Sequence, residues 1–215
     1  MERSNITGSE LERTGVVAVL RASKFEDYEP VVDTLVDVGI TCIELTLTTP
    51  NTIEKFASLR SQLPSKVELG IGTVTTVEEA TRAIDAGAQF VVTPISQPAV
   101  VETALKREVP VFPGSMTPTE VFTSWSTGAS AVKLFPAATV KPDFIKQLHG
   151  PFPTIDLLPS GGVTLHDIGA WIAAGAVAVS LGGPLVGDAF AGGNMAALRN
   201  RASEAISRVA EARAA

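Results

Sequence analysis

The sequence contains one cysteine, no run of basic residues and no long hydrophobic segment. The single cysteine, Cys42, excludes an internal disulfide and a cysteine-rich metal finger. Lys and Arg number 17 against 23 Asp and Glu, which leaves a net charge of −6 and argues against a basic surface for nucleic acid or anionic membranes. The longest apolar stretch, residues 170–183, is shorter than the roughly 18 residues that a membrane span needs. Because the first residues are polar, we expect no signal peptide and a cytoplasmic protein.

What the chain does contain is enough apolar sequence for a sizeable core, since 45% of its 215 residues are hydrophobic and 19% are charged. This length fits one domain, and we expect residues 1–215 to form a single unit. Eight short apolar runs alternate with longer helical segments, as in parallel strands that are covered on both faces. The predicted strands are Val16–Leu20, Cys42–Leu47, Val67–Ile71, Phe90–Val92, Val109–Phe112, Ala131–Phe135, Asp156–Leu158 and Ala178–Leu181.

Local signals predict where the helices begin. A Ser or Thr followed three residues later by Glu can form a capping box, and a proline directly after the cap suits the first helical turn. These signals are Ser23 with Glu26, Thr76 with Glu79, Thr117 with Glu120, and the pairs Thr49-Pro50 and Thr117-Pro118. Two terminal helices are also expected, over about residues 1–14 and about residues 194–215.

Glycines placed to end helices recur along the chain at Gly39, Gly87, Gly128 and Gly175. Each interval between them holds two strand–helix units, so the chain reads as four quarters of a (β/α)8 TIM barrel in the α/β class. A doubly wound open sheet is the alternative. The Gly-x-Gly-x-x-Gly turn of dinucleotide-binding folds is absent after the first strand, which favours the barrel.

A lysine interrupts the sixth predicted strand. Period-two alternation directs its neighbours Val132 and Leu134 toward the helices. Lys133 and Phe135 then face the barrel interior. A buried ammonium is costly unless it is paired or loses its proton, and a neutral amine is the nucleophile that forms Schiff bases with ketones. The same alternation turns Glu44 inward from the second strand, so the two residues are either a structural ion pair or a nucleophile with its acid–base partner.

Two glycine-containing loops follow the last two predicted strands. Ser160-Gly161-Gly162 opens a helix, and Gly182-Gly183 follows the eighth strand. Amides at the start of a helix bind anions, and these two loops are a common phosphate site in barrels. The alternative is that the glycines only permit tight turns. His149 and His166 lie away from the strand ends, so we expect no metal and no cofactor.

Seven segments of the chain recur in the same order in one known family. They are Val19-Leu20-Arg21, Ile43-Glu44-Leu45-Thr46, Gly70-Ile71-Gly72-Thr73-Val74, Val92-Thr93-Pro94, Phe112-Pro113-Gly114, Val132-Lys133-Leu134-Phe135-Pro136 and Ser160-Gly161-Gly162-Val163. On these residues the chain resembles the class I 2-keto-3-deoxy-6-phosphogluconate (KDPG) and 4-hydroxy-2-oxoglutarate (KHG) aldolases over residues 15–187.

The resemblance implies a homotrimeric barrel of Entner–Doudoroff-type sugar-acid catabolism. Such an enzyme reversibly cleaves a 2-keto-4-hydroxy acid to pyruvate and an aldehyde, glyceraldehyde 3-phosphate or glyoxylate, without a metal. By similarity Lys133 would form the Schiff base and Glu44 would transfer protons. The implied substrate contacts are Arg21, Thr48, Thr73, Pro94, Phe135, Ser160, Gly161, Gly162, Gly182 and Gly183.

The chain departs from the family pattern at two positions. Phosphogluconate-type members usually carry Arg where this chain has Thr48, and Arg21 could supply that guanidinium instead, as in phosphogalactonate-type members. Many members have Ser after the last Gly-Gly, where this chain has Pro184. Two other functions stay open: a phosphosugar isomerase or synthase that uses carboxylates, and a non-catalytic phosphosugar-binding barrel.

Overall fold

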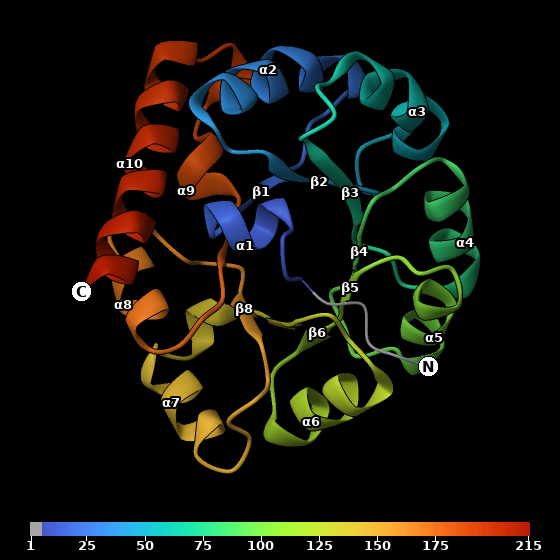
Figure 1. Ribbon diagram of the computed structural model, residues 1–215. Helices are drawn as coiled ribbons and strands as arrows, with labels where there is room; N and C mark the ends of the chain where they lie inside the picture. The colour runs from blue at the N-terminus through green and yellow to red at the C-terminus, as the bar shows by residue number, and fades with distance from the viewer. Residues whose placement is uncertain (1–5) are drawn as a thin grey trace.

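The computed structural model describes residues 6–215, which form a ring of parallel strands surrounded by helices (Figure 1). The strands are β1 (Val16–Leu20), β2 (Cys42–Thr46), β3 (Glu68–Gly72), β4 (Val91–Val92), β5 (Val111–Phe112), β6 (Gly114–Ser115), β7 (Val132–Leu134), β8 (Leu157–Pro159) and β9 (Val179–Leu181). The α-helices are α1 (Glu10–Thr14), α2 (Tyr28–Val38), α3 (Thr52–Gln62), α4 (Val77–Asp85), α5 (Pro98–Lys106), α6 (Pro118–Thr127), α7 (Asp143–His149), α8 (Ile168–Ala173), α9 (Gly183–Val186) and α10 (Met195–Ala214). Three 3₁₀ turns complete the set: η1 (Phe25–Asp27), η2 (Ala137–Thr139) and η3 (Ala189–Ala191).

Backbone pairing closes the ring. One set of parallel strands runs in the order β5-β4-β3-β2-β1-β9, and a second runs β6-β7-β8. A parallel bridge between Ser160 and Ser180 joins β8 to β9. At the other junction β5 and β6 are two halves of one strand, interrupted at Pro113, whose nitrogen has no hydrogen to donate. The Pro113 carbonyl still accepts the Lys133 N–H at 3.0 Å, so this strand stays paired with its neighbour across the break. When β5 and β6 are counted as one strand, the nine segments make the eight strands of a (β/α)8 barrel. The alternative of an open sheet is therefore wrong.

The apolar side chains fall into two layers. Val132 and Leu134 belong to the larger layer, which lies between the strands and the surrounding helices. The smaller layer fills the barrel interior and includes Cys42, Phe90 and Phe112. The rings of the two phenylalanines lie 5.5 Å apart. The period-two alternation that turns Lys133 away from the outer layer is therefore present in the structure.

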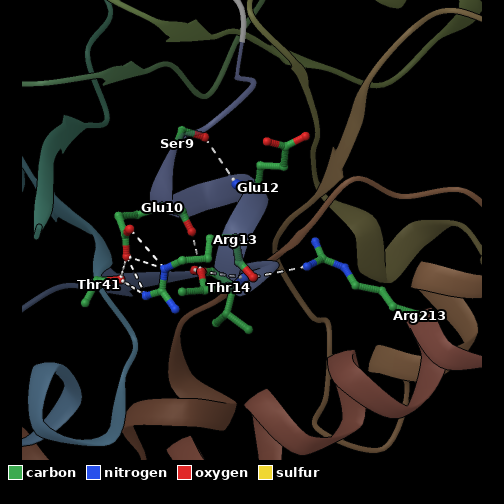
Figure 2. A network of polar contacts seen from close by, with 8 residues as sticks. Ser9, Glu10, Glu12, Arg13, Thr14, Thr41 and Arg213 are labelled. Atoms are coloured by element: carbon green, nitrogen blue, oxygen red, sulfur yellow. Dashed lines mark hydrogen bonds and ion pairs between the residues drawn. The ribbon is translucent and has the colours of Figure 1, made fainter.

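Helix α1 closes the amino-terminal end of the barrel, where it lies across the ring in Figure 1. Its Leu11 is buried in the interior layer. Around it, Figure 2 shows a polar network that ties α1 to Thr41, the residue before β2, and to Arg213. Glu10 contacts Arg13 and the Thr41 hydroxyl, and Arg213 of α10 donates to the Arg13 carbonyl at 3.2 Å. Helix α1 thus covers the amino-terminal end of the barrel, opposite the carboxyl ends of the strands.

Two of the three predicted capping boxes are confirmed. Thr76 with Glu79 starts α4, and Thr117 with Glu120 starts α6 with Pro118 in its first turn. The box at Ser23 and Glu26 is wrong, because a 3₁₀ turn precedes α2 and the caps of η1 and α2 make no side-chain hydrogen bond. Thr49-Pro50 does not begin a helix either. Asn51 caps α3, and the Thr49 hydroxyl is used elsewhere.

The terminal helices differ in how well they match the expectation. The expected helix over residues 194–215 is observed as α10, capped by the Asn194 side chain. Of the expected helix over residues 1–14, residues 1–5 lie outside the described residues, and among residues 6–14 only Glu10–Thr14 are helical. Ser9 caps this turn and Gly15 ends it in the left-handed conformation. Over residues 6–215, none of the helices has the length and apolar composition that a membrane crossing requires.

Candidate active site

A cavity of about 580 Å³ opens at the carboxyl ends of the barrel strands. Strand-end side chains and the loops after β8 and β9 converge on it, as the barrel topology requires. It brings together all the predicted site residues except Thr48. Those lining it are Arg21, Glu44, Thr73, Pro94, Lys133, Phe135, Ser160, Gly161, Gly162, Gly182 and Gly183.

Lys133 and Glu44 face each other in the buried part of this cavity. Lys133 Nζ lies 3.7 Å from Glu44 Oε2, and the two side chains are 8% and 2% exposed. This distance makes an ion pair but is too long for a hydrogen bond. Among the described residues Glu44 Oε2 has no hydrogen-bond partner. The arrangement thus sets an amine beside a carboxylate oxygen that is free to accept a proton from a third group.

The surroundings of the amine are apolar on one side. Phe135, two residues further along the same chain segment, places its ring centroid 5.4 Å from Lys133 Nζ. A cation over a ring face is stabilised by the ring quadrupole. The same ring forms a flat wall of the cavity, so a small planar group attached to the lysine would lie against it.

The charges that line the cavity favour an anionic ligand. Arg21, which follows β1, is exposed and contributes a second cation. Glu44 is the only carboxylate among the described lining residues. Two cations and one anion leave the site with an excess of positive charge in a chain that is acidic overall.

Thr73 lines the cavity in an unusual backbone conformation. It follows β3 with a φ of 65°, in the left-handed region that β-branched residues rarely adopt. Such a conformation costs roughly 1–3 kcal/mol and persists only where the surroundings enforce it. Because Thr73 lies at the cavity wall, its strained conformation is consistent with a backbone that is held in place to contact a ligand.

The two glycine loops bring bare backbone to the wall of the cavity. Gly161 and Gly162 have φ values of 79° and 90°. A Cβ on Gly161 would lie 2.8 Å from the Phe135 ring, and one on Gly162 would lie 2.4 Å from the Ala138 side chain. Within the described chain the amides of Gly161, Gly162 and Gly182 donate no backbone hydrogen bond. They are available to an anion.

Thr48 is the predicted site residue that the structure does not bring to the cavity. It is exposed in the turn after β2, and its Oγ1 lies 3.0 Å from the Thr46 hydroxyl. Conversely, the sequence did not identify the segment after β9. Gly187, Phe190 and Ala191 line the cavity there. The signal that could have found them is a glycine-rich stretch holding one aromatic residue directly after the Gly182-Gly183 loop.

Neither histidine reaches the cavity. His149 Nε2 lies 2.9 Å from the Ile155 carbonyl oxygen, and His166 is exposed near α8. Within residues 6–215, no three His, Cys, Asp or Glu side chains lie close enough together to hold a metal ion.

Comparisons with known proteins point to one family. A family model described as KDPG and KHG aldolase matches residues 7–200. The 2-dehydro-3-deoxy-phosphogluconate aldolase of Treponema pallidum is 37% identical over 76% of this chain and 78% of its own. The 2-dehydro-3-deoxy-6-phosphogalactonate aldolase of Escherichia coli is 31% identical over 79% of this chain and 83% of its own.

Solved structures agree with the sequence comparisons. A native KDPGal structure superposes with a TM-score of 0.87 at 29% identity, covering 93% of this chain and 96% of that one. The KDPG aldolase of Legionella pneumophila, with pyruvate captured at low pH as a covalent carbinolamine intermediate, superposes with a TM-score of 0.82 at 25% identity. That match covers 90% of this chain and 95% of the Legionella chain.

Proposed function

The chain belongs to the KDPG and KHG aldolase family, and on this premise we propose that it cleaves a 2-keto-4-hydroxy acid to pyruvate and an aldehyde. The observation that carries the proposal is the buried pair of Lys133 and Glu44, 3.7 Å apart in the cavity at the carboxyl ends of the strands. A carbinolamine of pyruvate in the Legionella relative supports Schiff-base chemistry in this family. Lys133 is the amine in this chain.

The reaction begins at the keto carbon. Glu44 takes a proton from the paired Lys133 ammonium, and the resulting neutral amine adds to C2 of the substrate. Glu44 returns this proton as the carbinolamine loses water, which gives a protonated imine and leaves Glu44 as a carboxylate. Glu44 then accepts the proton of the C4 hydroxyl through its free Oε2. The C3–C4 bond breaks, the aldehyde leaves, and the bonding electrons pass into the imine to form an enamine. Protonation at C3 by Glu44 and hydrolysis of the imine release pyruvate and regenerate the amine.

We propose that the remaining lining residues bind the two ends of the substrate. Arg21 and the backbone around Thr73 bind the carboxylate at the keto end, and Phe135 packs on the planar imine. Pro94 completes the cavity wall beside them. The free amides of Gly161, Gly162, Gly182 and Gly183 bind a phosphate at the far end, which favours a 6-phospho sugar acid as substrate. Pro184 offers no amide, so this phosphate site rests on backbone donors before it in the chain.

Trapping with borohydride tests the proposal. The folded protein is incubated with pyruvate, reduced, digested and examined by mass spectrometry. We expect a reduced pyruvyl adduct on the peptide that contains Lys133. Lys133→Met removes the adduct, whereas Lys141→Met, at an exposed position, leaves it in place. Absence of an adduct from the folded protein would refute the class I mechanism.

A homotrimer and a cytoplasmic location are further parts of the proposal. Large apolar side chains are exposed at Val77, Ile95 and Phe122, which follow β3, β4 and β6 in three neighbouring units of the barrel. We take these three exposed apolar side chains as the surface that the trimer buries. Light scattering of the wild type and of Ile95→Asp and Phe122→Asp tests it. We expect a trimer for the wild type and smaller species for the variants, and a monomeric wild type would contradict the proposal.

A further inference from the structure

Two hydroxyl groups hold the backbone on both sides of Arg21. Thr49, in the turn after β2, donates from Oγ1 to the Ala22 carbonyl at 2.9 Å and accepts the Ala22 N–H at 3.0 Å. The hydroxyl of Tyr28, the first residue of α2, lies 2.6 Å from Thr49 Oγ1 and 3.2 Å from the Leu20 carbonyl oxygen. The residue before Arg21 and the residue after it are therefore both fixed by one pair of side chains.

The available hydrogens define how the pair is connected. The Thr49 hydroxyl has one proton, which goes to the Ala22 carbonyl, and its oxygen accepts the Ala22 N–H. Its remaining acceptor site takes the Tyr28 proton, which is shared with the Leu20 carbonyl. Every donor and acceptor of the Thr49 hydroxyl is used. Removal of either hydroxyl therefore leaves buried polar groups without partners.

The pair is rigid because it is buried and packed. Tyr28 is fully buried and Thr49 is 1% exposed. The Tyr28 ring contacts Phe25 edge-on at 5.4 Å between centroids and Phe190 at 5.9 Å. Phe190 itself lines the cavity, so Tyr28 lies directly behind one cavity wall and beneath the strand end that carries Arg21. Hydrogen bonds in such an environment are stronger than in water, and losing one is correspondingly costly.

The guanidinium of Arg21, in contrast, has no anchor of its own. Among the described residues it makes no hydrogen bond and no ion pair, although it reaches the cavity. Its position therefore depends on the backbone that carries it. We propose that Tyr28 and Thr49 are positioning residues that aim the Arg21 guanidinium at an anionic group of the substrate. The inference rests on the proposed function, in which Arg21 binds the keto-acid carboxylate.

The test is the steady-state rate of KDPG cleavage, which is measured as the release of pyruvate. Thr49→Val keeps the shape of the side chain and removes its hydroxyl, and Tyr28→Phe does the same while keeping the ring contacts. We expect KM to rise about tenfold in Thr49→Val, which corresponds to a loss of ~1.4 kcal/mol of substrate binding. The kcat of this variant should stay within about twofold of the wild type. Thr49→Ser restores the hydroxyl, and its KM stays near that of the wild type.

A double-mutant cycle shows whether the effect passes through Arg21. We expect Thr49→Val to change KM by less than about twofold when Arg21 is already Ala, because the group that it positions is gone. The matched control is Thr14→Val, which removes a buried hydroxyl at the opposite end of the barrel. That variant lowers the melting temperature and leaves KM unchanged.

The outcomes separate this inference from the function on which it rests. Unchanged KM in both Thr49→Val and Tyr28→Phe, additive effects in the cycle, or a fall of kcat alone would each overturn the positioning role while the aldolase stands. If Thr49→Val does not fold, Tyr28→Phe alone and in the Arg21→Ala background decides the question. A folded wild-type protein that neither cleaves KDPG or its galactonate epimer nor forms the trapped pyruvate adduct overturns both proposals.

Discussion

Gly72 lies directly against the carboxylate of Glu44. The two residues are on the paired strands β3 and β2, and a Cβ built on Gly72 would lie 1.9 Å from Glu44 Oε1 and 2.4 Å from its carboxyl carbon. No side chain larger than hydrogen fits between the two strands while the carboxylate keeps its place. The position of the proposed proton acceptor is therefore set as much by the absence of a side chain on β3 as by the residue on β2.

Gly72→Ala is expected to displace the Glu44 carboxylate and to lower kcat about 100-fold, since a shift of about 1 Å in a reacting group costs this much. The measurement is kcat for KDPG cleavage together with the melting temperature. Gly169→Ala, in helix α8, is the control. A Cβ at this position would meet only the Ala212 side chain, at 4.0 Å. Alanine there raises helix stability by roughly 0.5–1 kcal/mol and leaves kcat unchanged. An unchanged kcat in Gly72→Ala would contradict the assigned place of the carboxylate.

Glu44→Gln keeps the size of the side chain and removes its ability to accept a proton. We expect kcat for cleavage to fall by about 10²–10⁴, the usual contribution of a general base. The reduced pyruvyl adduct on Lys133 should still form on longer incubation, because the amine remains. Mass spectrometry of the trapped variant, alongside the rate of cleavage, checks both statements. Cleavage at the wild-type rate would assign the proton transfer to another group.

The inward placement of Lys133 and Glu44 could be predicted because successive side chains of a strand point to opposite faces. Because the apolar neighbours Val132 and Leu134 face the helices, Lys133 must lie on the other face of the strand, toward the barrel interior. The glycine loops after β8 and β9 were predictable for a similar reason, since barrel topology places them at one end. Arg21 follows from the same rule at the end of β1.

Contacts between segments that are distant in sequence could not be predicted in this way. Tyr28 meets Thr49 only because α2 packs behind the turn after β2, and no local pattern marks either residue for that role. Phe190 reaches the cavity through a segment whose path depends on the packing of α9. The break of one strand at Pro113 was also missed, because the apolar run before it reads as a complete strand.

Ser180 offers a test of how buried polar groups contribute to stability. Its hydroxyl is buried on β9 and has no hydrogen-bond partner among the described residues. Ser180→Ala removes this unpaired group, so we expect the free energy of unfolding to stay the same or to rise by up to about 1 kcal/mol. Ser130→Ala is the matched contrast, because the Ser130 hydroxyl accepts the Val111 N–H at 3.1 Å. That change is expected to cost about 1–3 kcal/mol in urea unfolding. Equal losses in the two variants would contradict this account.

The network at the closed end of the barrel predicts a pH dependence of stability. The Arg13 guanidinium, which donates to Glu10 at 3.0 Å, lowers the pKa of the Glu10 carboxyl below its ordinary value of 4.5; burial opposes this shift, and the Thr41 hydroxyl adds to it. A carboxyl whose pKa is lower in the folded state stabilises the fold above its ordinary pKa. That contribution is lost as the pH falls through the lower, folded value.

Glu10→Gln should therefore be less stable than the wild type at pH 7, by about 1 kcal/mol for a partly exposed charged hydrogen bond. Below the ordinary pKa of 4.5 the difference should shrink, because the wild type loses the same interaction on protonation while the variant has none to lose. Urea unfolding of both proteins at several pH values between 7 and 3 measures the difference directly. Glu102→Gln, at an exposed position of α5, is the control for removing one negative charge. A difference that stays constant or grows on acidification would mean that the Glu10 carboxylate does not hold α1 in place.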